Sequence, residues 1–147
     1  MTTIAYRDGV LAADSLISCG QTRIGSVRKI VRANGFLAAL TGDMQDTVLL
    51  RRWLEAGCPE APNDDDASPW GTQGNDGGSG IVVDATGAMV FDNKLRRYAV
   101  DAPFLADGSG ADIALGAMAA GASAEDAVRI ACRLDTGSGE PVEAARL

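Results

Sequence analysis

Short apolar runs separated by glycine-containing turns dominate residues 1–40 of the chain. TTIAYR and GVLAADS flank Asp8-Gly9, and RKIVRA and FLAALTG flank Asn34-Gly35. Asp-Gly and Asn-Gly dipeptides readily adopt the positive φ angles of two-residue hairpin turns. The pattern therefore predicts two β-hairpins in the amino-terminal part of the chain.

A helical period replaces this pattern after residue 42. In DMQDTVLLRRWLEAG the apolar residues Met44, Val48, Leu49 and Trp53 recur at helical spacing, and Gly57 can end the element. We therefore expect one amphipathic helix here, with these apolar residues on its buried face.

Residues 58–79 combine prolines, an acidic run and glycines without any periodicity, which predicts a surface loop. The run Asp64–Asp66 could bind a cation, although such acidic runs are usually just solvated. A Gly-Ser-Gly sequence at Gly78–Gly80 precedes an apolar run rather than a helix, so we expect a turn there.

Strand patterns resume after the loop and then give way to helices. GIVVDATGAMVFD is interrupted by a turn at residues 85–87, and LRRYAVD and FLADGSG predict further strands. ADIALGAMAAG and SAEDAVRIACRLD predict two helices, the second with Ser123 as its N-cap and Asp126 three residues on. EPVEAARL predicts a last short strand. Blocks of antiparallel strands alternating with blocks of helices predict a layered α+β domain spanning residues 1–147.

Charge and composition exclude several classes of partner and site. The 147 residues carry a formal net charge of -7, which argues against nucleic acid or an anionic membrane surface as partner. No apolar run approaches the roughly 20 residues that a bilayer requires. Because the chain has no histidine, it cannot build a His-based triad or a His-ligated zinc site. Acid–base chemistry must then use an amine, a carboxylate or a water.

The start of the chain and its cysteines predict a compartment. No basic and apolar signal segment precedes TTIAY, and the three cysteines are too few and too scattered for a disulfide framework. We therefore expect a cytoplasmic protein.

Four stretches, taken in order, resemble the proteasome β-subunit and bacterial HslV peptidase family of N-terminal nucleophile hydrolases. They are TTIAY, GVLAADSLIS followed by VRKI, LAALTGDMQD, and the pair GSGAD and LDTGSG. The resemblance covers nearly the whole chain apart from the acidic loop, and it suggests a shortened bacterial or phage-type member. It implies a four-layer αββα sandwich with a reduced helical layer, because only one helix is expected between LTG and the next strands.

Thr2 is the candidate nucleophile that the resemblance implies. A threonine hydroxyl needs a nearby base, and removal of Met1 would give Thr2 an α-amino group with an ordinary pKa of about 8. The resemblance also places Asp14 and Lys29 beside the nucleophile, where a paired ammonium would favour the deprotonated forms of the Thr2 groups. Taken singly, Asp14 could instead end a strand and Lys29 could be exposed to solvent.

The resemblance assigns supporting roles to four more residues. The Gly42 N–H would stabilise an oxyanion, while Ser109, Asp135 and Ser138 would orient the amine and relay protons. Each has a simpler alternative. Gly42 could merely let the chain turn, Ser109 could cap the helix that starts nearby, and residues 135–139 could be a helix stop followed by a turn.

The resemblance also implies a bound cation whose ligands would be backbone carbonyls. In several relatives a structural monovalent or divalent cation is held at the end of the last helix, and the matching positions here are Cys132, Asp135 and Ser138. No cofactor is required for the implied chemistry.

Three functions remain open at this point. The first is a threonine endopeptidase subunit of a homo-oligomeric ring, which cleaves polypeptide substrates and has an ATPase unfoldase as its partner. The second is an N-terminal nucleophile amidase acting on small amides. The third is a catalytically silent ring or assembly protein. Both enzymatic hypotheses require that Met1 is removed.

Overall fold

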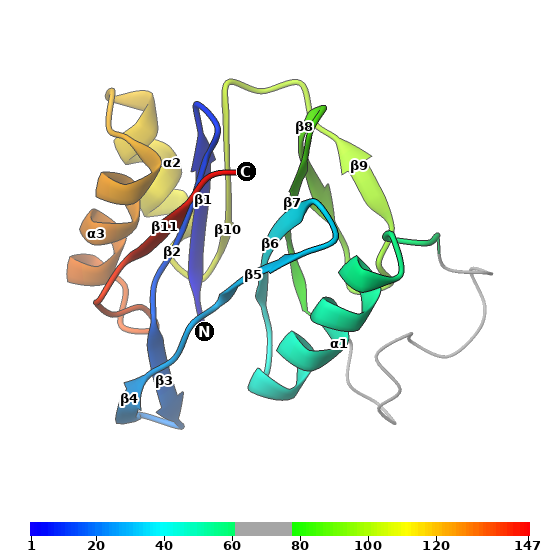
Figure 1. The fold of residues 1–147 in the computed structure, drawn as a ribbon. Helices are drawn as coiled ribbons and strands as arrows, with labels where there is room; N and C mark the ends of the chain where they lie inside the picture. Colours follow the sequence, from blue (N-terminus) through cyan, green and yellow to red (C-terminus); the bar gives the residue numbers. More distant parts are fainter. Residues whose placement is uncertain (61–77) are drawn as a thin grey trace.

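Antiparallel sheets and helices make up the molecule (Figure 1). The computed structural model describes residues 1–60 and 78–147. The helices are α1 (Met44–Glu55), α2 (Ala111–Ala119) and α3 (Ala124–Leu134). The strands are β1 (Thr3–Arg7), β2 (Val10–Ala13), β3 (Leu16–Cys19), β4 (Thr22–Ser26), β5 (Ile30–Ala33), β6 (Phe36–Thr41), β7 (Ser79–Asp84), β8 (Gly87–Phe91), β9 (Arg97–Ala99), β10 (Phe104–Gly108) and β11 (Glu143–Ala145).

Two sheets face each other between helices. The first sheet has the strand order β10-β1-β2-β11 and the second the order β5-β6-β7-β8-β9, while β3 and β4 form a separate hairpin. Across the molecule, α2 and α3 come first, then the first sheet, the second sheet and α1 (Figure 1). The predicted α+β class is confirmed.

Three apolar clusters hold these elements together. Successive residues of a strand point to opposite faces of the sheet, so each sheet has apolar side chains to bury on both faces. Ala5 and Ala12 of the first sheet pack against α2 and α3. Ile4 and Leu11 pack against Leu37 and other residues of the second sheet, which fills the space between the sheets. The third cluster lies between α1 and the outer face of the second sheet.

The predicted hairpin turns are confirmed. Asp8 and Gly9 join β1 to β2, and Asn34 and Gly35 join β5 to β6, all with positive φ angles between 50° and 80°. The β3–β4 hairpin was not expected from the pattern. All five residues of β4 are exposed, so the strand carries no apolar alternation that could have predicted it.

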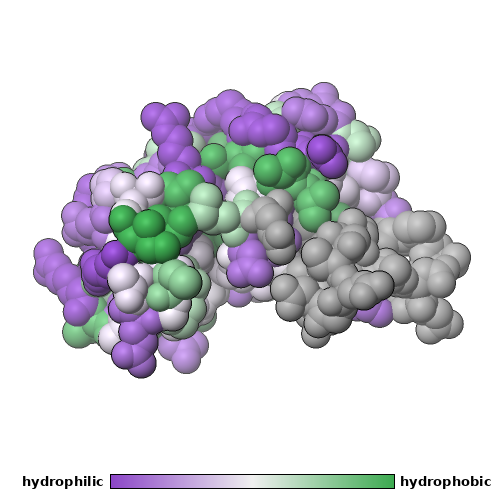
Figure 2. All heavy atoms as spheres, turned by 90° about the horizontal axis from the view of Figure 1, so that it is seen from below, coloured by the Kyte–Doolittle hydropathy of each residue, from purple (hydrophilic) through white to green (hydrophobic). Residues whose placement is uncertain are grey.

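The first helix is confirmed, but its expected buried face is wrong in part. Met44 and Val48 are 53% and 55% exposed, whereas Leu50, Trp53 and Leu54 are buried against the second sheet. The first turns of the helix therefore leave apolar side chains in solvent. Figure 2 shows the lower face of the molecule, where exposed hydrophobic side chains lie among polar ones.

The expected surface loop at residues 58–79 is wrong at both of its ends. Cys58 is buried in the core beneath α1, and the Trp53 indole donates to the Pro59 carbonyl at 3.0 Å. The turn expected at Gly78–Gly80 is also wrong, since β7 begins at Ser79. A Cβ at Gly80 would lie 2.1 Å from the carbonyl oxygen of the neighbouring strand, so close strand approach explains that glycine. Residues 61–77, with the acidic run Asp64–Asp66, lie outside the described residues.

The carboxyl-terminal elements follow the prediction. Helix α2 and helix α3 form where the helical periods lie, and the Ser123 hydroxyl accepts the Asp126 N–H at 3.1 Å as the N-cap of α3. The tail forms β11, which pairs with β2. Within residues 1–60 and 78–147, no helix has the length and apolar character needed to cross a bilayer.

Candidate active site

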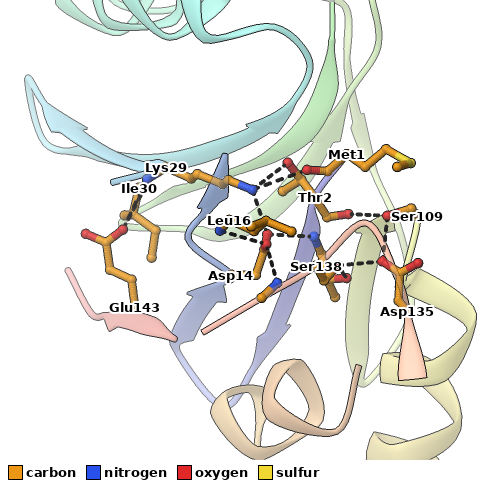
Figure 3. Close-up of polar contacts among 12 residues, drawn as sticks. Met1, Thr2, Asp14, Leu16, Lys29, Ile30, Ser109, Asp135, Ser138 and Glu143 are labelled. Carbon is orange, nitrogen blue, oxygen red and sulfur yellow. Dashed lines mark hydrogen bonds and ion pairs between the residues drawn. The ribbon is translucent and has the colours of Figure 1, made fainter. Parts of the chain in front are cut away.

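Thr2 lies immediately before β1 and next to a carboxylate–ammonium pair (Figure 3). Lys29 Nζ donates to Asp14 Oδ1 at 2.8 Å, to Thr2 Oγ1 at 3.0 Å and to the Met1 carbonyl at 3.2 Å. The Lys29 side chain is only 11% exposed and the Asp14 side chain is fully buried. The alternative in which Lys29 points into solvent therefore does not hold.

Both oxygens of Asp14 are held by hydrogen bonds, from four donors in all. Oδ1 accepts the Thr3 N–H at 3.0 Å as well as the ammonium, and Oδ2 accepts the Leu16 and Gly139 N–H groups at 3.1 and 3.0 Å. These bonds compensate the loss of hydration that a buried carboxylate suffers. They also hold the Asp14 carboxylate in the orientation in which Oδ1 accepts the Lys29 ammonium.

A second polar network lies on the other side of Thr2. Ser138 Oγ and Ser109 Oγ donate to Asp135 Oδ2 at 2.6 and 2.7 Å, and the Ser109 N–H donates to the Thr2 carbonyl at 2.8 Å. Thr3 Oγ1 lies 2.6 Å from Ser138 Oγ. Because the single hydroxyl proton of Ser138 is donated to Asp135, Thr3 is the donor of this bond.

This network lowers the pKa of the Asp135 carboxyl group. Partial burial raises its pKa, but hydrogen bonds from the Ser138 and Ser109 hydroxyls and from the Gly137 N–H outweigh burial, and the pKa lies below its ordinary value. Ser109 does not cap α2, since Gly110 occupies the N-cap position of that helix. Asp135 is the C-cap of α3, which agrees with the simpler alternative of a helix stop at residues 135–139. Its side chain nevertheless belongs to the network with Ser109 and Ser138.

Substitution of Asp135 by asparagine should reduce the acid sensitivity of the fold. A carboxyl group with a depressed pKa in the folded state stabilises that state above its ordinary pKa, and the contribution is lost as the pH falls through the folded value. The free energy of unfolding of Asp135→Asn should therefore fall less steeply than that of the wild type below about pH 4. Urea unfolding between pH 7 and pH 3 measures this slope, with exposed Asp101→Asn as control. Identical acid slopes in wild type and Asp135→Asn would contradict the prediction.

Gly42 and Thr2 border the same cavity, which has a volume of about 110 Å³ and is also lined by Lys29. Gly42 precedes Asp43, the N-cap of α1. A Cβ at Gly42 would lie 2.9 Å from both Asp46 Oδ2 and Leu40 Cδ1, so a larger residue there would displace these two side chains. This crowding concerns packing alone, so the role of the Gly42 N–H stays a prediction.

A larger cavity of about 560 Å³ is also bordered by Met1, and it shares Leu16 and Ser18 with the smaller one. Its walls include Leu16, Arg23 and Thr136.

Three polar contributions were not expected from the sequence. Thr3 joins the Asp135 network, and the Gly139 N–H holds Asp14. Ser79 Oγ donates to Asp107 Oδ2 at 2.7 Å, which links the second sheet to the strand that leads to Ser109. The pair of consecutive threonines could have pointed to the first contribution. The other two join residues that are far apart in the sequence: 28 positions for Ser79 and Asp107, and 125 positions for Gly139 and Asp14.

The residues expected to hold a cation are partly used within the protein. The Asp135 carbonyl accepts the Ser138 N–H at 3.3 Å, and the Ser138 hydroxyl is engaged by Thr3 and Asp135. Burial raises the pKa of the Cys132 thiol to about 11, which disfavours a thiolate ligand. Over the described parts of the chain, no group of three or more acidic or cysteine side chains converges as a metal site. The carbonyl-bound cation remains a prediction.

Solved structures share this fold across the whole chain. BPH from Thiobacillus denitrificans in complex with epoxomicin superposes with a TM-score of 0.71 at 21% identity, covering 99% of this chain and 97% of that one. A structure of BPH alone gives a TM-score of 0.70 at 21% identity and covers 99% and 96%. Eukaryotic HslV from Trypanosoma brucei gives 0.72 at 22% identity and covers 99% of both chains.

Comparison by sequence gives no corresponding match. No protein-family model matches the chain, and no curated protein does. The likeness to HslV-type proteins that the sequence predicts is confirmed, and it is a likeness of fold.

Proposed function

We propose that this chain is a threonine endopeptidase subunit whose nucleophile is the Thr2 hydroxyl after removal of Met1. The observation that supports this most strongly is the contact of Lys29 Nζ with Thr2 Oγ1 at 3.0 Å, while the same ammonium is paired with buried Asp14. The fold shared with HslV and BPH is consistent with it. In this proposal the layers are the four-layer αββα sandwich of N-terminal nucleophile hydrolases, with α1 as a reduced helical layer.

The acylation step follows from the groups around Thr2. The free α-amino group of Thr2, directly or through a water, would take the hydroxyl proton as Oγ1 attacks the substrate carbonyl. The Lys29 ammonium favours this because its positive charge stabilises the developing alkoxide. The Gly42 N–H would donate to the oxyanion of the tetrahedral intermediate. The protonated amine then gives its proton to the leaving nitrogen as the C–N bond breaks.

Deacylation uses the same groups in the reverse order. A water attacks the ester between the acyl group and Thr2, the amine takes a proton from that water, and Oγ1 recovers a proton as it leaves. In this scheme the hydrogen bonds among Asp135, Ser109 and Ser138 orient the Thr2 amine. Ser109 donates both to Asp135 and, through its N–H, to the Thr2 carbonyl, so it would hold the backbone from which the amine projects.

Met1 blocks this chemistry when it is present. Its peptide bond turns the Thr2 nitrogen into an amide, which cannot act as a base near neutral pH. The structure includes Met1, so it describes the precursor in this proposal. Lys29 Nζ also donates to the Met1 carbonyl, so the ammonium is in place before the nucleophile is released.

The wider assembly is part of the same proposal. HslV-type folds suggest a homo-oligomeric ring in the cytoplasm that acts on polypeptides and works with an ATPase unfoldase. An amidase for small amides would use the same residues. A catalytically silent assembly protein would keep Met1, and a single helix between β6 and β7 among the described residues is compatible with such a role.

Two measurements test the proposal. Intact-mass analysis of protein purified from its native cells should show loss of Met1, and an epoxyketone such as epoxomicin should then form a covalent adduct at Thr2. Hydrolysis of casein in preference to small amides would distinguish a peptidase from an amidase. Retention of Met1 together with absence of any adduct would overturn the enzyme proposal and leave the assembly protein.

A further inference from the structure

Glu143 of the last strand bonds to the backbone of the catalytic lysine proposed above. Its Oε2 atom accepts the Lys29 N–H at 3.2 Å and the Ile30 N–H at 3.3 Å (Figure 3). Glu143 lies opposite Ala13 in the β11–β2 pair, and Ala13 is the residue before Asp14. One carboxylate therefore connects the edge of the first sheet to the start of the second.

The position of the two N–H groups explains why an acceptor is needed there. Ile30 begins β5, which among residues 1–60 and 78–147 is an edge strand of the second sheet and pairs only with β6. An edge strand has N–H groups without a neighbouring strand to accept them, and such groups are costly when partly buried. Glu143 satisfies two consecutive N–H groups and so fixes the backbone from which the Lys29 side chain leaves.

The same carboxyl-terminal segment also holds the partner of Lys29. The Gly139 N–H donates to Asp14 Oδ2 at 3.0 Å, and the Gly139 carbonyl accepts the Ser15 N–H at 3.0 Å. Residues 139–143 thus contact both members of the ion pair, Asp14 at one end and Lys29 at the other.

We propose that Glu143 is a positioning residue for the Lys29 ammonium, so that residues 139–143 brace the Asp14–Lys29 pair against Thr2. This inference rests on the proposed function for its catalytic consequence. A lysine side chain has four flexible carbons, and its ammonium is well placed only if its backbone and its partner are both held. A displacement of about 1 Å in a catalytic group can reduce the rate by about 100-fold.

Lysine NMR tests the geometry without using activity. The chain contains two lysines, Lys29 and Lys94, so labelling with [13C]lysine gives two Cε signals. In Glu143→Ala the Lys29 signal should shift and broaden while the Lys94 signal stays unchanged. Glu143→Gln keeps an oxygen acceptor and should restore the wild-type Lys29 signal. An unchanged Lys29 signal in Glu143→Ala overturns the inference.

Covalent labelling tests the catalytic consequence on the processed protein. Glu143→Ala should lower the maximal rate of epoxyketone inactivation by about tenfold with little change in the inhibitor concentration for half-maximal rate, because positioning acts on the chemical step. Glu143→Gln and exposed Glu140→Ala, in the same segment, should behave like wild type. A loss in Glu143→Ala that Glu143→Gln does not restore would overturn the hydrogen-bond role.

The two proposals fail in different ways. If wild-type protein without Met1 is not labelled, the peptidase proposal fails, and the lysine signals alone decide the bracing role of Glu143. If the wild type is labelled and Glu143→Ala is labelled equally fast, the peptidase proposal stands and the inference about Glu143 is wrong.

Discussion

Replacement of Thr2 by alanine is expected to abolish peptide hydrolysis and epoxyketone labelling. The substitution removes the hydroxyl that Lys29 Nζ contacts at 3.0 Å but leaves the amine and the Asp14–Lys29 pair. Loss of a catalytic nucleophile typically lowers the turnover rate by a factor of about 10⁴ to 10⁶. Turnover of a fluorogenic peptide and the intact mass after incubation with the inhibitor measure both losses.

The control for this experiment is Thr3→Ser. Thr3 Oγ1 donates to Ser138 Oγ in a buried contact, so a variant without this hydroxyl would disturb the Asp135 network for reasons unrelated to nucleophilic attack. Serine keeps the donor, and loss of one buried methyl group costs only about 1 kcal/mol in the free energy of unfolding. Thr3→Ser should therefore stay folded and be labelled at close to the wild-type rate. Labelling that persists in Thr2→Ala would exclude Thr2 as the nucleophile.

Replacement of Asp14 by asparagine is expected to destabilise the fold strongly. The carboxylate is fully buried and accepts the Lys29 ammonium and three backbone N–H groups. The amide would point an N–H toward these donors, and the nearly buried ammonium would lose its countercharge. Breaking a buried ion pair from one side costs about 3–5 kcal/mol in the free energy of unfolding.

Denaturant unfolding at pH 7 measures this effect, with the exposed Asp101→Asn as matched control. The control should change the free energy of unfolding by less than about 0.5 kcal/mol, because surface substitutions away from specific contacts are usually nearly neutral. An equal stability of Asp14→Asn and the wild type would mean that the ion pair and its hydrogen bonds contribute nothing net to the fold.

The sequence predicts local features of this fold well and its faces less well. Asp8-Gly9 and Asn34-Gly35 mark their turns because the required φ angles depend on the residues themselves. The buried side of α1 is different. Met44 and Val48 share one side of the helix, whereas Leu50 and Leu54 share the other, because Val48 lies about 200° around the helix from Leu50. The side with Leu50 packs on the second sheet, and the first side stays exposed. Both sides carry apolar residues, so the period alone does not say which one is buried.

The candidate site likewise combines residues that the sequence predicts with contacts that it does not predict. Thr2, Asp14 and Lys29 were expected together only through the ordered resemblance to a family, since no periodicity relates them. Contacts across long stretches of chain were missed for the same reason. Glu143 lies 114 residues from Lys29, and a lone glutamate in a short final strand carries no local sign that it accepts N–H groups from another sheet.

The two sheets divide the proposed chemistry between them. Thr2 and Asp14 flank strands of the first sheet, whereas Lys29 enters the second sheet at Ile30, and the two sheets meet through the apolar cluster that contains Leu11 and Leu37. The ammonium that contacts the Thr2 hydroxyl is thus supplied by the second sheet, so its placement depends on how the two sheets pack. Tightly packed interiors transmit changes in volume, so an apolar substitution in that cluster, remote from Thr2, should be detectable as a change in nucleophile reactivity before it is detectable as loss of the fold.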